Sequence, residues 1–550
     1  MHEPRDPAKL TWCQQEMYVI RHENVGVDVD RMQVAGFPKA TPEVAAVRLA
    51  SKDNLPIVAA LRDVNWFARN KVSTRSAHDV LTRQSRPRRR TTKKINLAPF
   101  FVKSCLAPFL VALSACQAID PHNMIGRQMG EAAGVPTEPV PSPPPATLGA
   151  EARSRAFDFV WDTINDHYYD AKLNGVDWKA VRGRYRPLAL KAANDDEFWD
   201  ALDRMTGELR DAHTRVESPK SVAMRQKDEA VTLGFTFAPI EGRLLVTGVN
   251  SETDAWWAGV RPGMAVVGIG GEPAMQAYER VKAQTRLDST ERSRHSRILR
   301  RILTGEPGSK MSFAFERADG SRFDANLSRK RITSRPGESH RILPSGYGYI
   351  RFTQWTVGVT ADVLTAIAEL KETPGIIIDL RGNPGGSAHA VNLILRRFFP
   401  KHAELGQTMT RSGKPIALFF GTVEIIKLKN SVPGDADAYK GPVVILVNSG
   451  SASASELFSS TMQAAGRAVV MGQPSCGCLL GFLGYARVPG GAELAYSEVG
   501  FVLTNGKRIE GEGVIPDVPV PLTARDLQLN RDRALEEAQA RLATMKPWDK

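Results

Sequence analysis

The chain has few cysteines and none of the spacings that mark a zinc site. It contains five cysteines in 550 residues, an odd number, with no Cys-x-x-Cys pair and no Cys/His ligand pattern. Neither a zinc module nor a disulfide framework therefore supports the fold. The 42% hydrophobic and 24% charged content is that of an ordinary globular protein, and the length predicts two to four domains.

Outside the N-terminal segment the chain has little excess of basic over acidic residues. The formal net charge is +13, but residues 1–103 carry 19 Lys and Arg against 10 Asp and Glu, whereas the remaining residues carry 54 against 50. The basic residues are densest in RPRRRTTKK, Arg86 to Lys94. Because the rest of the chain is close to neutral, nucleic acid is not expected among its partners.

The hydrophobic run within KSCLAPFLVALSAC, Lys103 to Cys116, is too short to span a bilayer. A lysine, about a dozen apolar or small residues and a final Leu-Ser-Ala-Cys form the layout of a secretory signal peptide. The ending resembles a bacterial lipobox, which implies that Cys116 is lipidated and holds a periplasmic protein to a membrane. Gln117 in the next position slightly favours the outer membrane, and a short buried helix is the alternative.

Composition and periodicity divide the chain into segments. GVPTEPVPSPPPATLG contains six prolines in sixteen residues and predicts a semi-rigid spacer. Helical spacing of apolar residues follows, with Asp195 or Asp196 as the expected cap of the third helix. Residues 1–85 carry no motif and are expected either to precede the natural protein or to form a small separate domain. The other expected segments are a lipoprotein signal peptide (86–116), a Pro-rich linker (117–150), an N-terminal helical domain (151–220), a β-rich domain (225–335), an α/β core (340–525) and a C-terminal helix (526–550).

The β-rich segment resembles a PDZ domain. Leu-Gly-Phe at 233–235 is followed by AGVRPGM and then by VGIGG, which is the order of motifs in that family. The resemblance implies that Leu233, Gly234 and Phe235 form the loop whose backbone N–H groups bind the C-terminal carboxylate of a peptide. Protein or peptide C-terminal tails are therefore the expected partners.

The α/β segment contains two strand-to-helix junctions that suit catalysis. Buried strands rich in Val, Ile and Leu alternate with helices, which predicts a parallel sheet covered on both faces. IDLRGNPGGSA (Ile378 to Ala388) places a Gly-Gly pair at a helix start, where backbone N–H groups can stabilise negative charge. NSGSASASE places a serine at the head of the sheet, so a serine nucleophile beside an oxyanion hole is indicated.

Together these motifs resemble the tail-specific or C-terminal processing proteases. The resemblance covers about Phe157 to Leu522 and includes the closing EGEGVIPDVPV. It implies a ClpP-like (crotonase-like) α/β core with an inserted PDZ domain. It also implies that Ser453 is the nucleophile and that Gly385 or Gly386, with the N–H of Ala454, forms the oxyanion hole. No metal or organic cofactor is needed for such a serine endopeptidase.

The position of the family's usual general base, a lysine, is occupied by Cys478. The tricorn-type branch lacks this lysine too, and takes its base from a histidine in a pattern like GELxxSH. GELRDAHT places His213 in that role, with Ala212 where tricorn has a serine, so an auxiliary hydroxyl is missing. The orienting acid of the branch maps to Glu510, which completes a Ser453, His213, Glu510 triad.

Several alternatives stay open from the sequence. His389 is a rival base and Glu512 a rival acid, while His213 could be a structural residue that caps a helix. Cys476 and Cys478 are expected to be two packed thiols, since a disulfide across one residue is strained. Without the lysine, a non-catalytic peptide-binding protein on the protease scaffold is the alternative to an active enzyme.

Overall fold

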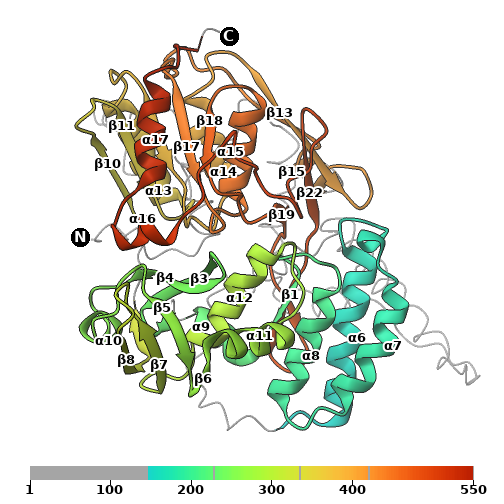
Figure 1. Ribbon diagram of the computed structural model, residues 1–550. Helices are drawn as coiled ribbons and strands as arrows, with labels where there is room; N and C mark the ends of the chain where they lie inside the picture. Colours follow the sequence, from blue (N-terminus) through green and yellow to red (C-terminus); the bar gives the residue numbers. More distant parts are fainter. Residues whose placement is uncertain (1–146, 227–229, 333–335, 419–421, 549–550) are drawn as a thin grey trace, which may run out of the picture. The chain divides into compact units, whose positions relative to one another are not determined.

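Three regions of different architecture follow one another along the chain (Figure 1). The computed structural model describes residues 147–226, 230–332, 336–418 and 422–548, and all of them belong to one compact unit. Residues 1–85, the expected signal peptide with Cys116 and nearly all of the expected linker lie outside the described residues. None of the described helices combines the length and apolar character needed to cross a membrane.

Helices form the first region, as the spacing of its apolar residues predicts. They are α6 (Ala150–His167), α7 (Trp178–Leu190) and α8 (Asp195–Gly207), with a 3₁₀ turn at Leu173–Gly175. The expectation that Asp195 or Asp196 caps α8 is wrong, because the side chain of Asn194 accepts the N–H of Glu197. Both aspartates lie in the first turn instead, where the helix dipole favours acidic residues.

The core of these helices is completed by a segment from the far end of the chain. Phe157, Ile164 and Phe198 share a buried cluster with Leu494 and Tyr496. Beyond α8, strand β1 (Arg215–Glu217) pairs antiparallel with β21 (Ala492–Ala495), which pairs with β20 (Ala486–Val488). The loop between α8 and β1, which carries His213, is therefore fixed at both ends.

Strands dominate the second region, residues 230–332. Its antiparallel sheet has the order β3-β4-β5-β7-β8, with β6 paired to β5, around a core of phenylalanines that includes Phe235 and Phe313. Strands β2 (Ala230–Thr232) and β9 (Lys330–Ile332) pair antiparallel, so the two ends of this region lie side by side. Helix α9 (Pro219–Gln226) precedes this region. The other elements of the region are β3 (Phe235–Ile240), β4 (Arg243–Val249), α10 (Asp254–Trp257), β5 (Ala265–Ile269), β6 (Glu272–Pro273), α11 (Ala274–Gln284), α12 (Glu291–Leu303), β7 (Lys310–Glu316) and β8 (Arg322–Ser328).

The third region is built on a sheet of order β10-β11-β12-β17-β18-β23. The predicted α/β core is confirmed, with parallel pairing from β11 to β23, but the edge strand β10 is antiparallel. The elements are β10 (Glu338–Ile342), β11 (Gly348–Phe352), α13 (Val357–Glu369), β12 (Ile376–Asp379), α14 (Ala388–Arg396), β17 (Val443–Val447), α15 (Ala454–Ala464), β18 (Val469–Gly472), β23 (Val518–Pro519), α16 (Ala524–Gln528) and α17 (Arg533–Leu542).

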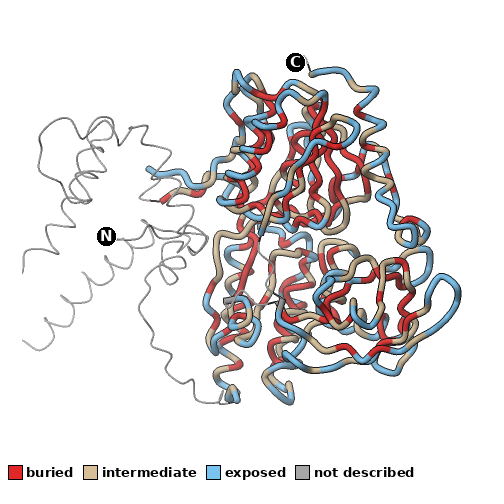
Figure 2. The backbone as a smooth tube through the Cα atoms, turned by 90° about the vertical axis from the view of Figure 1, so that its left-hand side faces the viewer, coloured by how far each residue is buried: buried red, intermediate tan, exposed pale blue. Residues whose placement is uncertain are grey.

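Helices cover both faces of this sheet. Val443, Ile445 and Val447 of the central strand β17 pack in the cluster that contains the apolar residues of α13, α14 and α15. Val444 and Leu446, which point the other way, pack in the cluster that contains Ala538 and Leu542 of α17. Every residue of β12 and β17 is buried, which explains their continuous Val/Ile/Leu composition (Figure 2).

A second, smaller sheet adjoins the core with the order β16-β13-β22-β19. Its strands are β13 (Ala403–Thr410), β16 (Lys429–Val432), β19 (Leu480–Gly481) and β22 (Val499–Leu503), and a hairpin is formed by β14 (Ile416–Leu418) and β15 (Val423–Ile426). The turn that precedes β19 contains both Cys476 and Cys478.

Candidate active site

Ser453 differs from the other two serines of GSASASE. The hydroxyl of buried Ser451 donates to the carbonyl of Leu380 at 2.8 Å, and that of buried Ser455 donates to the carbonyl of Asn383 at 3.0 Å. Both are used to hold the loop that contains the Gly-Gly pair. Ser453 alone among the three is only half-buried, so it is the one that a substrate can reach.

The backbone at Ser453 is held in an unusual conformation. The residue ends the turn between β17 and α15 with φ of 51° and ψ of −114°. Positive φ is rare for residues other than glycine and occurs where the surrounding structure enforces it. Because a strained turn between a strand and a helix can present a hydroxyl at the top of a sheet, this conformation suits a nucleophile.

The Gly-Gly pair lies directly against this turn. A Cβ atom on Gly385 would be 2.7 Å from the Cβ of Ser453 and 2.9 Å from the backbone nitrogen of Ala454. Asn383 Oδ1 accepts the N–H of Gly385 at 3.0 Å, so this N–H is already used. Gly386 forms a parallel bridge with Trp355 in which the flanking residues supply the hydrogen bonds. The N–H groups of Gly386 and Ala454 have no hydrogen-bond partner among the described residues, so they fit an oxyanion hole better than Gly385 does.

Glu456 joins the serine turn to the cysteine turn, a role that the sequence analysis does not predict. The side chain is fully buried. Its Oε2 accepts the N–H of Ser453 at 3.0 Å and that of Cys478 at 2.9 Å, and its Oε1 accepts the N–H of Gly477 at 2.6 Å. Burial raises the pKa of this carboxyl, against the lowering effect of these donors. The only sequence signal was the glutamate that ends GSASASE.

Cys476 and Cys478 form a disulfide, so the expectation of two packed thiols is wrong. Their Cα atoms are 5.3 Å apart, which lies within the ordinary range for a disulfide even across one residue. Gly477 makes this turn with φ of 77°. The turn contacts the serine directly, because the carbonyl of Cys478 accepts the N–H of Ser453 at 3.2 Å.

His213 lies in the loop between α8 and β1. Asp211 Oδ1 accepts its backbone N–H at 2.7 Å, and the imidazole packs against Phe482 with ring centroids 6.2 Å apart. Nδ1 is enclosed, and no described residue offers it a hydrogen bond. Burial lowers the pKa of His213, with Arg215 and Arg297 adding to the effect while Asp211 and Asp288 oppose it. The imidazole is therefore favoured in its neutral form, as a general base must be.

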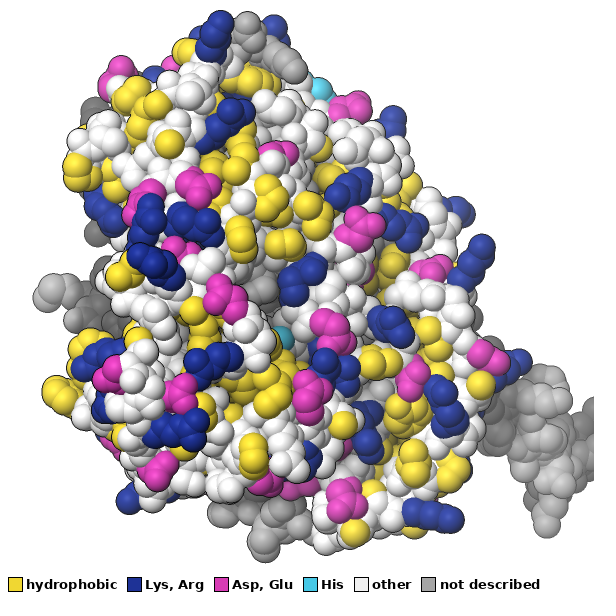
Figure 3. Space-filling model, viewed as in Figure 1, with side chains coloured by type: hydrophobic (Ala, Val, Ile, Leu, Met, Phe, Trp, Pro, Cys, Tyr) yellow, Lys and Arg dark blue, Asp and Glu magenta, His cyan; other side chains and the backbone are white. Residues whose placement is uncertain are grey.

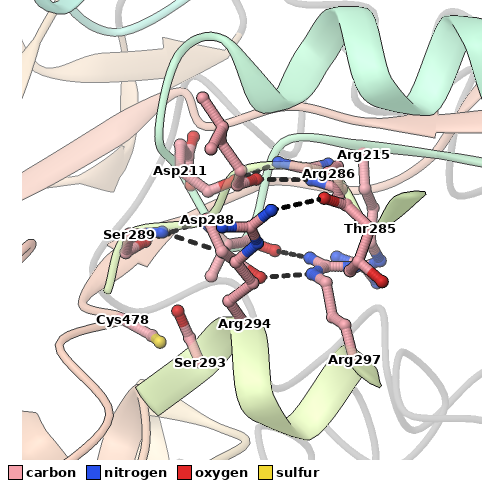
Figure 4. Close-up of polar contacts among 12 residues, drawn as sticks. Asp211, Arg215, Thr285, Arg286, Asp288, Ser289, Ser293, Arg294, Arg297 and Cys478 are labelled. Atoms are coloured by element: carbon pink, nitrogen blue, oxygen red, sulfur yellow. Dashed lines mark hydrogen bonds and ion pairs between the residues drawn. The ribbon is translucent and has the colours of Figure 1, made fainter. Parts of the chain in front are cut away.

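The loop of His213 is held by buried arginines from the segment around α12 (Figure 4). Arg286 donates to the carbonyl of Asp211 at 2.8 Å and to that of Thr214 at 2.7 Å. Arg297 donates to the carbonyl of Ala212 at 2.8 Å and forms an ion pair with Asp288. The backbone on both sides of His213 is thus anchored to the β-rich region.

Glu510 follows strand β22 and is half-buried. Its Oε1 accepts a hydrogen bond from the hydroxyl of Ser289, and its Oε2 is enclosed with no hydrogen-bond partner in the part of the chain that the structure describes. Burial first, and then the negative charges of Asp211 and Glu456, raise the pKa of Glu510 well above its ordinary value. Its sequence rival Glu512 is exposed, with a lysine as its ion-pair partner, and so lies in a different environment.

The three predicted triad residues converge on the turn at 476–482. Ser453 hydrogen-bonds Cys478, His213 packs on Phe482, and the neighbour of Glu510, Gly511, donates its N–H to the carbonyl of Gly477 at 3.0 Å. Within the described part of the chain, however, no hydrogen bond joins any two of the three side chains. His389, the rival base, lies in the first turn of α14 beside the Gly-Gly loop.

The expected carboxylate-binding loop lies at the start of β3. Leu233, Gly234 and Phe235 are all buried, and Gly234 adopts a φ of 80°. A Cβ atom there would be 2.2 Å from the side chain of Thr253, so only glycine fits this turn. The described residues include no group of three or more His, Cys, Asp or Glu side chains that could hold a metal ion.

Comparison with known proteins assigns two parts of the chain. Residues 346–520 match the model of peptidase family S41, and residues 150–207 match that of the tricorn protease C1 domain. A carboxyl-terminal-processing protease of Synechocystis sp. is 26% identical over 68% of this chain and 82% of that protein. Tricorn protease homolog 1 of Streptomyces coelicolor is 25% identical over 70% of this chain, which spans only 34% of that homologue.

The fold also recurs in solved structures. The crystal structure of mature CPAF superposes with a TM-score of 0.54 at 14% sequence identity, covering 71% of this chain and 96% of that one. At this level of identity the likeness concerns the fold alone.

Proposed function

The chain carries a serine-type peptidase domain of family S41 at residues 346–520, and we propose that it is an endopeptidase whose nucleophile is Ser453. The observation that carries the proposal is the environment of this serine. It is the only accessible hydroxyl of its motif, it is held at positive φ, and Gly385 of the Gly-Gly loop lies directly against it. Among the described residues the N–H groups of Gly386, in the same loop, and of Ala454 have no hydrogen-bond partner.

In the proposed mechanism, Ser453 Oγ attacks the carbonyl carbon of the scissile peptide and its proton passes to Nε2 of His213. The N–H groups of Gly386 and Ala454 stabilise the oxyanion of the tetrahedral intermediate. His213 then returns the proton to the leaving amine, and an acyl-enzyme remains on Ser453. Water repeats the sequence to release the acid product, while Glu510 orients His213 and balances its charge.

Recruitment of substrates by their C-terminal tails is the second part of the proposal. The antiparallel sheet of residues 230–332, with α11 packed on it, supports a PDZ domain inserted between the helical region and the core. A peptide would add as a strand beside β3, with its carboxylate at the backbone of residues 233–235. The related Synechocystis protein is named a carboxyl-terminal-processing protease, which agrees with recognition of chain ends.

A periplasmic location with a lipid anchor at Cys116 is proposed from the sequence pattern of residues 103–116. Mass spectrometry of the natural protein tests the anchor. An N-terminus that retains residue 1 and carries no lipid would contradict it.

Basic and acidic side chains alternate over the face of the molecule that Figure 3 shows, which gives no support to nucleic-acid binding.

A peptide-binding protein without catalysis is the second candidate. It is favoured by the cysteine at the position of the family's lysine and by the missing hydrogen bonds among Ser453, His213 and Glu510. The two candidates differ in the reactivity of one atom, because only an activated Ser453 reacts with a fluorophosphonate.

The experiment is fluorophosphonate labelling together with cleavage of fluorescein-labelled casein. We expect the wild type to be labelled at Ser453 and to cleave casein, and S453A to do neither while keeping its thermal unfolding midpoint. H213A should lose nearly as much activity, a fall of about a thousandfold or more. H389A serves as the matched control and should keep its activity. Full activity of H213A would refute the triad, and an unlabelled wild type would favour the binding protein.

A further inference from the structure

No hydrogen bond among the described residues connects the proposed orienting acid, Glu510, to the proposed base, His213. Glu510 Oε2 and His213 Nδ1 are both enclosed, and neither has a hydrogen-bond partner among the described residues. An orienting acid acts by holding the Nδ1–H of the imidazole in place. The tricorn-type pattern has a hydroxyl next to the histidine, but this chain has Ala212 there. A hydroxyl for this link must come from another segment.

Ser289, in the connection between α11 and α12, contacts Glu510 and the residue that precedes His213. Its Oγ donates a hydrogen bond to Glu510 Oε1, and it accepts the backbone N–H of Ala212 at 2.8 Å. Ala212 is the residue immediately before His213. A serine hydroxyl can donate once and accept twice. Within the described residues one acceptor position of Ser289 is therefore left for the Nδ1–H of His213.

The surrounding contacts hold this hydroxyl in position (Figure 4). Asp288 Oδ1 accepts the N–H of Ser289 at 2.9 Å, and Asp288 is in turn paired with Arg297, which donates to the carbonyl of Ala212. The peptide groups flanking Ala212 are thus bound on one side by Ser289 and on the other by Arg297. On the far side, Thr290 donates to the carbonyl of Cys476, in the turn that contacts Ser453.

We propose that Ser289 is a positioning residue that links the carboxylate of Glu510 to the imidazole of His213, supplying the hydroxyl that Ala212 lacks. The inference rests on the proposed peptidase function. During attack the proton of Ser453 moves to His213 Nε2, and the proton on Nδ1 stays in place, shared with Ser289 Oγ. Ser289 keeps its own proton, directed at Glu510, so the negative carboxylate stabilises the imidazolium through one hydroxyl.

The test compares S289A with a variant that restores the hydroxyl elsewhere. We expect S289A to lower kcat/KM for fluorescein-labelled casein, and the rate of fluorophosphonate labelling, by about tenfold or more. The double variant A212S/S289A returns a hydroxyl to the position where the tricorn pattern has it. It should recover most of the lost activity, which loss of packing alone would not allow.

The pH profile gives a readout that a purely structural role would not move. Ser289 donates to the ionised carboxylate of Glu510 and so lowers its pKa. Removing this donor raises that pKa, and the acid limb of the kcat/KM profile should shift to higher pH in S289A. S289T keeps a hydroxyl and should stay close to the wild type, which preserves the test if S289A unfolds.

S293A is the matched control, because Ser293 belongs to the same helix start and its hydroxyl contacts Thr290 but neither Glu510 nor Ala212. The inference requires the loss in S289A, the recovery in A212S/S289A and retained activity in S293A. If S289A matches the wild type, or if S293A falls as far, Ser289 has no positioning role. If the wild type itself neither cleaves casein nor takes the label, the proposed function fails and this inference with it.

Discussion

Ser453 donates its backbone N–H to Oε2 of Glu456, a carboxylate with no exposed surface. The same carboxylate accepts hydrogen bonds from the cysteine turn, so one buried acid fixes the proposed nucleophile relative to the loop on which the proposed base and orienting acid converge.

The variant E456Q tests this role. Every hydrogen-bond partner of this carboxylate among the described residues is a donor, so an amide would direct its own N–H₂ group at another N–H. We expect a loss of about 2–4 kcal/mol in the free energy of unfolding and a fall in kcat, measured by urea denaturation and casein cleavage. The exposed Glu512 offers the control, since E512Q should change neither quantity. Wild-type activity in a folded E456Q would show that the serine turn does not depend on Glu456.

Substitution of Gly385 should disturb the nucleophile itself. A Cβ atom there would lie 2.7 Å from that of Ser453, so G385A must displace the serine or the Gly-Gly loop. Gly382 provides a close comparison, because it also has positive φ, 77° against 102°, but a Cβ atom on it meets nothing within 4 Å. We expect G385A to abolish fluorophosphonate labelling and G382A to lose only about 1 kcal/mol of stability while still reacting. Equal labelling of both would argue against close contact at Ser453.

The acid side of the pH profile should depend on two groups. The proposed triad needs neutral His213 and ionised Glu510, and burial lowers the pKa of the first and raises that of the second. Falling pH therefore removes activity through both groups, and kcat/KM should rise with a slope above one on the acid limb. The charged groups facing them are Asp211, Asp288, Arg215 and Arg297 for His213, and Asp211 and Glu456 for Glu510.

The variant E510Q separates function from stability. The pKa of Glu510 is raised on folding, so its ionisation at neutral pH opposes folding, and this cost disappears as the pH falls through the folded-state value. A neutral glutamine avoids the cost. We expect E510Q to lose activity and yet to gain about 1–3 kcal/mol of stability at neutral pH, measured by denaturation. A destabilised E510Q would indicate that the carboxylate is better solvated than its enclosed Oε2 suggests.

The disulfide between Cys476 and Cys478 should matter more for activity than for stability. It closes a loop of only three residues, which corresponds to about 1–2 kcal/mol of stabilisation. The carbonyl of Cys478 in this turn nevertheless accepts a hydrogen bond from the N–H of Ser453. C476S/C478S should therefore lower the rate of fluorophosphonate labelling. Dithiothreitol should affect the wild type but not the double variant. Identical labelling rates with and without the bond would remove any role for it at the site.

The sequence is sufficient to predict those features of the fold and the site that depend on local patterns. Continuous Val and Ile in β12 and β17 predicted buried strands, and GSASASE with the glycine pair predicted where a nucleophile and an oxyanion hole could form. Strand β10 was not predicted, because Glu338–Ile342 is polar and becomes a strand only by pairing with β11 at a sheet edge.

The sequence patterns do not predict contacts between residues that are far apart in the chain. Ser289 and Glu510 are 221 positions apart, and nothing in the local sequence of either residue indicates that they meet. The sequence does not predict the disulfide, because the separation of the two Cα atoms depends on the conformation of the turn at Gly477. The choice of Gly386 over Gly385 likewise depends on where the side chain of Asn383 points.

The pairing of β1 with β21 has a consequence for the protein's biogenesis. Arg215, two residues after His213, takes its register from Ala495, and the helices before it share their core with the same late segment. If His213 is the base, as proposed, it reaches its final position only after the segment 492–495 has been synthesised. In a shorter nascent chain Ser453 would have no ordered partner for its proton, so we expect the proposed peptidase activity to begin only late in synthesis.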